Sequence, residues 1–142
     1  MFSEIIKDMN WVAVFVGALA YFMLGALWYS LLFQKQWVAY QGITKEDMEK
    51  PGAKKGVGVI MFASFVLMFV NSFALSVLVN KMGVWGWMSG VKLGLFTGIC
   101  FACVSIGINM LYEKKPLGLF FINGAYQVVG NIIAAVIIVL WQ

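Results

Sequence analysis

The residues that most resemble a chemical motif are Cys100 and Cys103, which form a Cys-Phe-Ala-Cys sequence. Two thiols at this spacing are typical of thiol–disulfide exchange, because one sulfur can resolve a disulfide formed by the other. Membrane oxidoreductases that use such a pair need further cysteines to relay electrons, and this chain has only 2. Both also lie deep in an apolar run, where a thiol is inert. We interpret them as small packing residues and keep redox exchange as the alternative.

A row of amides near the end of the chain is the second candidate. Asn123, Gln127 and Asn131 follow one another at intervals of four residues, with Tyr126 adjoining, and this spacing places them on one face of a helix. Asn71, in an earlier apolar run, falls at a similar depth. We call these four amides the polar stripe. Because amides that face lipid are costly, the polar stripe is expected to face protein or water.

Two interpretations of the polar stripe remain open. In the first, which we favour, the amides make hydrogen bonds between helices, each worth about 0.6 kcal/mol on average. In the second they line a pocket or path for a small neutral ligand. The hydroxyl and amide residues at matching depth are candidate partners: Ser64, Thr97, Ser105 and Asn109.

Residue types that the chain lacks exclude several kinds of chemistry. There is no His, so haem ligation and His-based metal or acid–base chemistry are ruled out. No apolar run contains Asp or Glu, which disfavours proton exchange through a buried carboxylate. All 10 basic residues are Lys, so the planar donor most used for phosphate recognition is missing. We therefore expect no catalytic residue, no cofactor and no metal site. The net charge of +4 is attributed to membrane lipids rather than to a nucleic acid.

The composition predicts where these residues must lie. The chain of 142 residues is 63% hydrophobic and 11% charged, with a mean hydropathy of +0.91, whereas soluble domains are roughly 45–50% apolar and about 25% charged. A bilayer core is crossed by about 20 apolar residues in a helix. Four runs are long enough: 11–33, 56–79, 84–111 and 117–141. We predict an all-α integral membrane protein, a four-helix transmembrane bundle that forms a single domain over residues 1–142.

The third run carries a row of small residues, Gly90, Gly94, Gly98 and Ala102, again at intervals of four. Inside lipid, such a face lets another helix backbone approach closely. Packing within one chain is the interpretation that we favour, and a subunit interface is the alternative. Lys92 lies in the same run, about 9 Å along the helix from Gly86. A lysine at this depth reaches the interface by snorkelling, and the alternative is a functional charge.

The lysines also predict an orientation. The connections 34–55 and 112–116 hold seven of them, whereas Lys7 and Lys81 lie on the opposite side. The positive-inside rule places the long loop 34–55 in the cytoplasm and both termini outside it. In that loop the spacing of Thr44 and Asp47 matches a capping box, which predicts a short surface helix before Pro51-Gly52. Interfacial anchors are expected at Trp28, Tyr29 and Trp37.

At the other end of the chain, Phe2, Ile5, Ile6 and Met9 fall at helical spacing. They predict an interfacial turn that leads into the first span. The alternative is the frayed start of the span itself.

Two stretches resemble a known family. Residues 26–37 read Ala-Leu-Trp-Tyr-Ser-Leu-Leu-Phe-Gln-Lys-Gln-Trp and are followed by Gly42-Ile43-Thr44. Residues 123–130 read Asn-Gly-Ala-Tyr-Gln-Val-Val-Gly, and Leu140-Trp141 closes the run. Both are similar to a bacterial membrane family catalogued as domain of unknown function 1761. The resemblance implies a four-helix protein of the bacterial inner membrane without an established activity, and it supplies no catalytic residues.

Three functions are compatible with these observations. The leading hypothesis is a non-enzymatic accessory subunit that packs with copies of itself or with a larger membrane complex, through the glycine row and the loop. The alternative is a carrier or channel for a small neutral solute, lined by the polar stripe. A thiol or lipid enzyme that depends on Cys103 ranks last.

Overall fold

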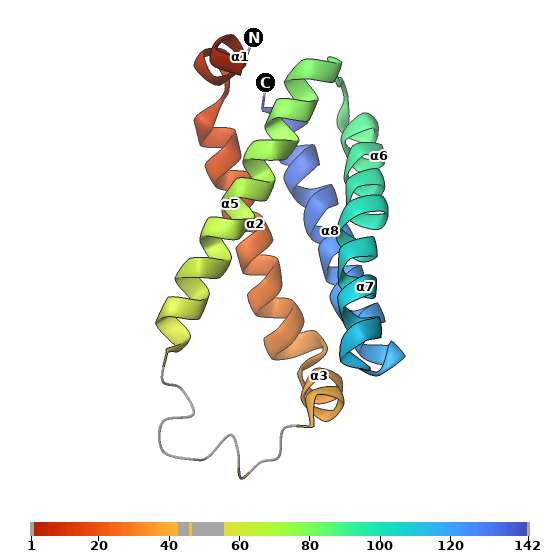
Figure 1. The fold of residues 1–142 in the computed structure, drawn as a ribbon. Coiled ribbons are helices and arrows are strands. Elements are labelled where there is room, and N and C mark those ends of the chain that lie inside the picture. Colours follow the sequence, from red (N-terminus) through yellow and green to blue (C-terminus); the bar gives the residue numbers. More distant parts are fainter. Residues whose placement is uncertain (1, 43–45, 47–55, 142) are drawn as a thin grey trace.

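The computed structural model describes residues 2–42, 46 and 56–141, and the elements in these ranges are all helical (Figure 1). In chain order they are α1 (Phe2–Asp8), α2 (Trp11–Leu27), the π-helical segment η1 (Trp28–Leu32), α3 (Gln34–Gln41), α5 (Val57–Met82), α6 (Trp87–Thr97), the π-helical segment η2 (Gly98–Cys103), α7 (Val104–Glu113) and α8 (Leu117–Leu140).

Four helical stretches in the described part of the chain are long and apolar enough to cross a membrane. They are Trp11–Leu32, Val57–Met82, Trp87–Glu113 and Leu117–Leu140. These agree with the four predicted spans to within a few residues and confirm the all-α membrane fold. The third span begins later than predicted because Gly86, with φ 81°, ends the connection before it, and the second span continues to Met82.

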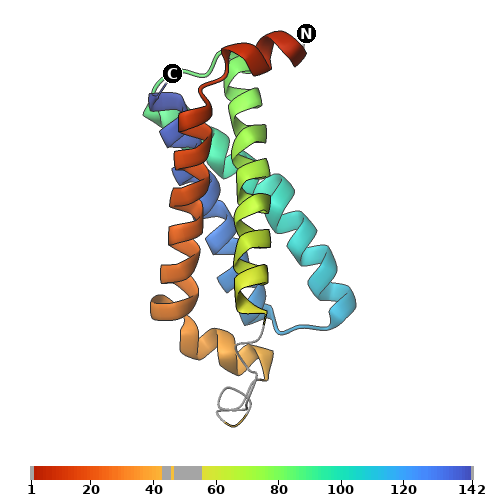
Figure 2. The same cartoon turned by 90° about the vertical axis from the view of Figure 1, so that its left-hand side faces the viewer.

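The spans run alternately up and down, and α8 lies at the centre (Figures 1 and 2). It packs against α2, α5, α6 and η2. Half of its most apolar stretch is buried inside the molecule, compared with 28% for the first span, 22% for the second and 17% for the third. The last span along the chain therefore contributes the largest share of the interior.

The first span begins at an explicit cap. The Asn10 side chain accepts a hydrogen bond of 3.1 Å from the backbone N–H of Ala13, which satisfies one of the free donors at the start of α2. Its Nδ2 donates to the carbonyl of Trp141 at 2.6 Å, so the first and last spans along the chain are joined at this end. The cap separates α1 from α2, and α1 turns away from the bundle axis (Figure 2). The predicted N-terminal turn is thus a helix of its own, with Met9 buried behind it.

Part of the segment predicted as a loop is helical. Phe33 leaves the helical conformation, and α3 then runs across the end of the bundle to Gly42, whose φ of 71° ends it (Figure 2). The Tyr40 ring lies where a Cβ on Gly118 would be, at the start of α8. The short helix predicted from Thr44 and Asp47, together with Pro51-Gly52, lies outside the described residues.

The connections alternate between two ends of the bundle. α1, the turn at 83–86 and Trp141 lie at one end, the α1 end, and α3 and the turn at 114–116 lie at the other, the α3 end (Figure 1). The predicted pairing of the connections therefore agrees with the structure, whereas the side of the membrane that each end faces stays a prediction.

Candidate functional site

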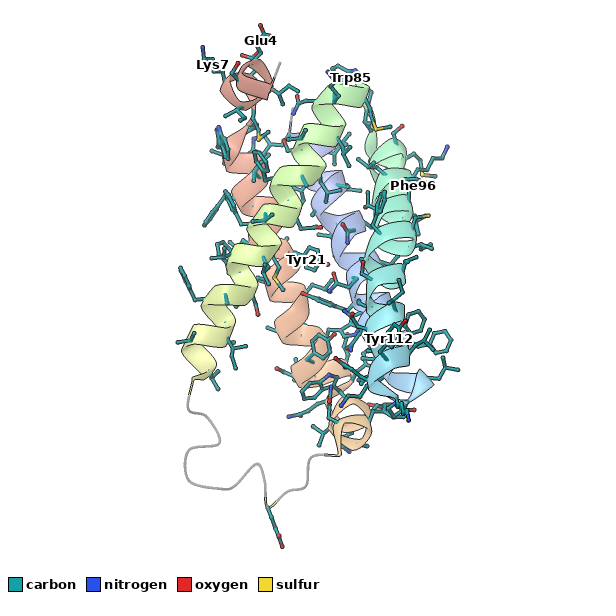
Figure 3. The ribbon with its side chains drawn as sticks, in the orientation of Figure 1. Glu4, Lys7, Tyr21, Trp85, Phe96 and Tyr112 are labelled. Carbon is teal, nitrogen blue, oxygen red and sulfur yellow. The ribbon has the colours of Figure 1, made fainter. Side chains whose placement is uncertain are left out.

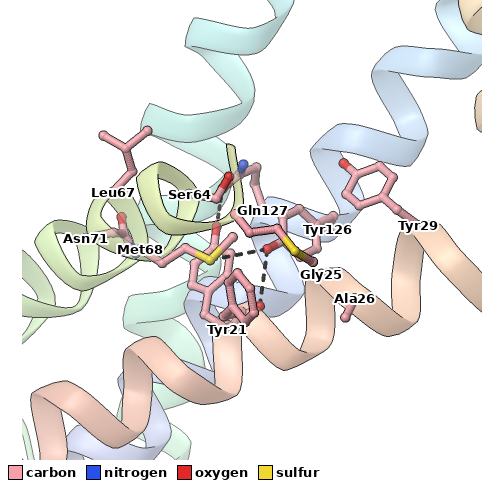
Figure 4. A pocket seen from close by; sticks show the side chains of 12 residues that line it. Tyr21, Gly25, Ala26, Tyr29, Ser64, Leu67, Met68, Asn71, Tyr126 and Gln127 are labelled. Carbon is pink, nitrogen blue, oxygen red and sulfur yellow. Dashed lines mark hydrogen bonds between the residues drawn. The ribbon is translucent and has the colours of Figure 1, made fainter. Parts of the chain in front are cut away.

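A cavity of about 510 Å³ lies between α2, α5 and α8 (Figure 4). It is lined by Tyr21, Phe22, Gly25 and Ala26 of α2, Tyr29 of η1, Met61, Ser64, Leu67, Met68 and Asn71 of α5, and Tyr126 and Gln127 of α8. Its volume falls within the range of small-molecule sites, roughly 300–1,000 Å³. None of the lining side chains carries a formal charge.

Two tyrosines form the inner wall of the cavity. Both are buried, and their rings meet edge to face with centroids 5.3 Å apart. The Tyr126 hydroxyl donates to the backbone carbonyl of Tyr21 at 3.2 Å, and the Tyr21 hydroxyl donates to Oε1 of Gln127 (Figure 4). Each buried ring therefore has a partner for its polar end, as burial of a tyrosine requires.

Glycines make the space that these rings occupy. A Cβ on Gly130 would lie 2.5 Å from the Tyr21 ring, and a Cβ on Gly25 would lie 2.7 Å from the Tyr126 hydroxyl. Real Cβ atoms do not come so close to another heavy atom, so the tyrosine pair depends on both glycines. Tyr21, which lies near the middle of the bundle (Figure 3), was not among the candidates predicted from the sequence. The available signal was a tyrosine in the middle of an apolar span, whose hydroxyl needs a partner there.

Hydrogen-bond donors remain available inside the cavity. Within the described part of the chain, no hydrogen bond occupies the side-chain nitrogen of Gln127 or the Ser64 hydroxyl, and both residues line the space. Among the same residues, no buried side-chain nitrogen or oxygen lacks a partner. These two groups are therefore accessible, and a bound molecule would find a primary amide and a hydroxyl on facing helices.

A cluster of amides closes one side of this cavity. Asn131 is only 2% exposed, and its Oδ1 accepts from Asn71 Nδ2 at 3.1 Å and from Thr97 Oγ1 at 3.4 Å. Its Nδ2 donates to the Gln127 carbonyl at 2.7 Å. A second cavity of about 310 Å³ lies beyond, and Asn71, Thr97, Ser105 and Asn131 are among its lining residues. Asn71 thus lines both cavities, whereas its partner Asn131 lines only the second.

The fourth member of the polar stripe belongs to a different cluster. The Tyr29 hydroxyl donates to Asn123 Oδ1 at 2.7 Å, and Trp28 Nε1 donates to the Ile122 carbonyl at 3.1 Å. Tyr29 also meets the Trp37 ring edge to face at 5.8 Å. The three residues expected as interfacial anchors are half-buried, and they join η1 and α3 to α8. The structure therefore brings Asn71, Gln127 and Asn131 together and leaves Asn123 apart.

The glycine row faces α8 of the same chain. A Cβ would lie 3.1 Å from Val136 Cα at Gly90, 2.6 Å from Ile132 N at Gly94 and 2.7 Å from Val128 Cα at Gly98. Ala102, half-buried, lines the second cavity instead. The close approach that these small residues permit is occupied within the chain.

The remaining candidates lie apart from the cavity. Cys100 is exposed, and half-buried Cys103 contacts the Gly124 carbonyl through its Sγ at 3.5 Å; both thiols are free. Lys92 is exposed on α6. Among the residues whose positions are given, no cluster of three or more His, Cys, Asp or Glu is arranged to hold a metal ion. Asn109, exposed on α7, lines neither cavity.

Comparison with known proteins adds a family but no activity. Residues 12–139 match the family model described as "Protein of unknown function (DUF1761)". No curated protein and no solved structure matches the chain.

Proposed function

The chain belongs to the DUF1761 family of proteins of unknown function, and we propose that it binds a small neutral molecule inside the membrane, in the cavity between α2, α5 and α8. One observation carries this proposal: uncharged polar groups from three helices converge on a space of about 510 Å³. Polar groups at this depth are expensive, so their convergence on a cavity favours a functional role.

The lining indicates the class of ligand. The free amide nitrogen of Gln127 and the Ser64 hydroxyl offer donors, which suit a hydroxyl or carbonyl oxygen on the ligand. The aromatic and methionine side chains around them favour an apolar body, because such walls bind it by contact. A charged ligand would find no counter-charge there.

The opening of the cavity indicates a route from the lipid. Ala26, Met61 and Leu67 are exposed residues of its lining, and residues 56–63 at the start of α5 are all exposed. This part of α5 diverges from α2 toward the α3 end (Figure 1). A molecule dissolved in the bilayer can therefore enter between the two helices.

A carrier or channel is the fuller form of the same proposal. The second cavity shares Asn71 with the first, and Asn71 donates a hydrogen bond to Asn131, so a solute that moved from one cavity to the other would pass this amide. The accessory-subunit role stays a prediction, and the glycine row on which it relied is occupied by α8.

Flux through reconstituted vesicles tests the proposal. The probes are neutral solutes of increasing apolar character, namely urea, glycerol and phenol. Gln127→Leu removes the free donor from the cavity, and we expect it to lower flux of the transported probe at least about tenfold, equivalent to about 1.4 kcal/mol. The matched control is Asn109→Leu, which makes the same exchange of amide for leucine at an exposed position outside both cavities.

Binding is measured separately from transport. A bound probe raises the unfolding temperature of the detergent-purified protein, and this shift is expected to persist in Asn109→Leu and to disappear in Gln127→Leu. Equal flux and equal shifts for wild type and Gln127→Leu would rule out the cavity as the site.

A further inference from the structure

The turn between α7 and α8 forms a separate groove at the α3 end of the molecule. Its volume is about 380 Å³, and its lining is apolar except for Lys114 and Lys115. It shares no lining residue with the two cavities described above. Whatever occupies it is therefore independent of the neutral-ligand site.

The Phe120 ring packs against Gly107, and the two residues form the floor of the groove. A Cβ at Gly107 would lie 3.3 Å from this ring, so a side chain there would crowd the floor. Leu111 and Leu117 form its walls and are 79% and 70% exposed. Uncovered apolar walls along two membrane-spanning helices suit an acyl chain.

The two lysines belong to a hydrogen-bonded turn at the end of this groove. The N–H of Lys115 donates to the Met110 carbonyl at 3.1 Å, and that of Lys114 donates to the Leu111 carbonyl at 3.4 Å. This pattern ends α7 with Lys114 in the left-handed conformation, at φ 55°, where glycine is the usual residue. Lys114 is the only non-glycine residue with positive φ in the described part of the chain. Lys114 therefore adopts a backbone conformation that lysine disfavours. Its side chain and that of Lys115 both line the groove, so the turn places two cationic residues beside it.

We propose that this groove binds one anionic phospholipid, with its phosphate at Lys114 and Lys115 and an acyl chain along Gly107 and Phe120. Charge complementarity selects the anionic class, because both charged residues of the lining are cationic and an ammonium is a compact charge suited to a phosphate. Glu113, the nearest carboxylate in sequence, is exposed and does not line the groove.

Lipid titration of the detergent-purified protein, read by native mass spectrometry, tests this site. The probe is dioleoyl phosphatidylglycerol, and dioleoyl phosphatidylcholine serves as the neutral comparison. The double variant Lys114→Gly/Lys115→Gln is expected to bind the anionic lipid about 25-fold more weakly, since each lysine near an anionic headgroup contributes roughly fivefold. The control is Lys35→Gln, which removes an exposed charge at the same end but outside the groove, and it is expected to bind normally.

Two further measurements separate binding from folding. Glycine suits the conformation of residue 114 better than lysine does, so the double variant is expected to unfold at the wild-type temperature or above it. Leu111→Gln, at an exposed wall, is expected to weaken binding of the dioleoyl lipid at least about fourfold, the effect of burying one methylene.

Three outcomes would contradict the proposal of a lipid site. They are equal affinity of the double variant and the wild type, equal affinity for the two lipids, and displacement of the lipid by inorganic phosphate at equimolar concentration, which would assign the lysines to a free anion.

Discussion

The two sides of α8 are built in opposite ways. On one side the third span lies directly against its backbone, at distances that only glycine permits at Gly94 and Gly98. On the other side, α2 and α5 meet toward the α1 end, where Ser72 Oγ donates to the Val14 carbonyl at 2.8 Å and Trp11 stacks on Phe73 at 5.8 Å. The two helices diverge toward the α3 end (Figure 1), and the cavity lies between them and α8.

This contrast shows how a small membrane protein separates stability from binding. Lipid is as apolar as the helices, so association depends on close packing and polar contacts. We call the side formed by the third span and α8 the sealed side, and it supplies the close packing. We call the side formed by α2, α5 and α8 the open side, because α2 and α5 diverge there toward the α3 end and line the cavity. Changes on the sealed side are therefore expected to affect folding, and changes on the open side are expected to affect ligands.

The largest effect is expected at Gly94. A Cβ there would lie 2.6 Å from the backbone nitrogen of Ile132, and backbone cannot yield as a side chain does. Gly94→Leu is expected to lower the free energy of unfolding by about 3 kcal/mol, measured by denaturant titration in detergent micelles. Gly58→Leu is the matched control, because a Cβ at Gly58 meets nothing within 4 Å. Comparable losses in both variants would contradict the sealed side as the source of stability.

An intermediate effect is expected at Asn131, which lies between the two sides. Asn131→Leu keeps the approximate volume but removes its bonds to Asn71, Thr97 and the Gln127 carbonyl. At about 0.6 kcal/mol for each bond, the loss is about 2 kcal/mol, measured in the same titration. Asn109→Leu provides the control and is expected to leave stability unchanged. If Asn131→Leu and the wild type had the same free energy of unfolding, the amide cluster would have no role in holding α5 to α8.

The smallest effect on stability is expected at Tyr21. Tyr21→Phe keeps the ring and removes only the hydrogen bond to Gln127, so the free energy of unfolding is expected to fall by about 0.6 kcal/mol. Ligand affinity is expected to fall roughly fivefold, because the amide of Gln127 loses the hydroxyl that orients it. Tyr112→Phe, at a residue 86% exposed, is the control for both measurements. A change in stability without a change in affinity would assign Tyr21 to the packing of the molecule rather than to the cavity.

Sequence analysis predicted the spans correctly because hydropathy is summed over about 20 residues and tolerates local error. It did not predict η1 and η2, since a π-helical turn depends on a single additional residue in the turn. It also read α3 as loop, because the sequence Gln34–Gln41 has little apolar periodicity and its helix is held in place by Tyr40 against Gly118.

The candidate site was predictable only in part. Spacing places Asn123, Gln127 and Asn131 on one face of a helix, but it does not state which helix lies opposite each of them. In the structure, Asn131 meets Asn71 while Asn123 meets Tyr29. The glycine row had the same limitation: its spacing predicts close approach and leaves the identity of the partner open. Both answers depend on which spans become neighbours, a property of the whole bundle.

The central position of α8 has a consequence for biosynthesis. Among the described residues, the third span packs mainly against α8, and Asn10 reaches its partner Trp141 only across 131 residues of chain. During synthesis from the N-terminus, the third span therefore lies in the bilayer without its main packing partner until α8 has been made. A chain truncated before residue 117 would keep the contact between α2 and α5 but would leave the glycine row of the third span without the backbone that it packs against.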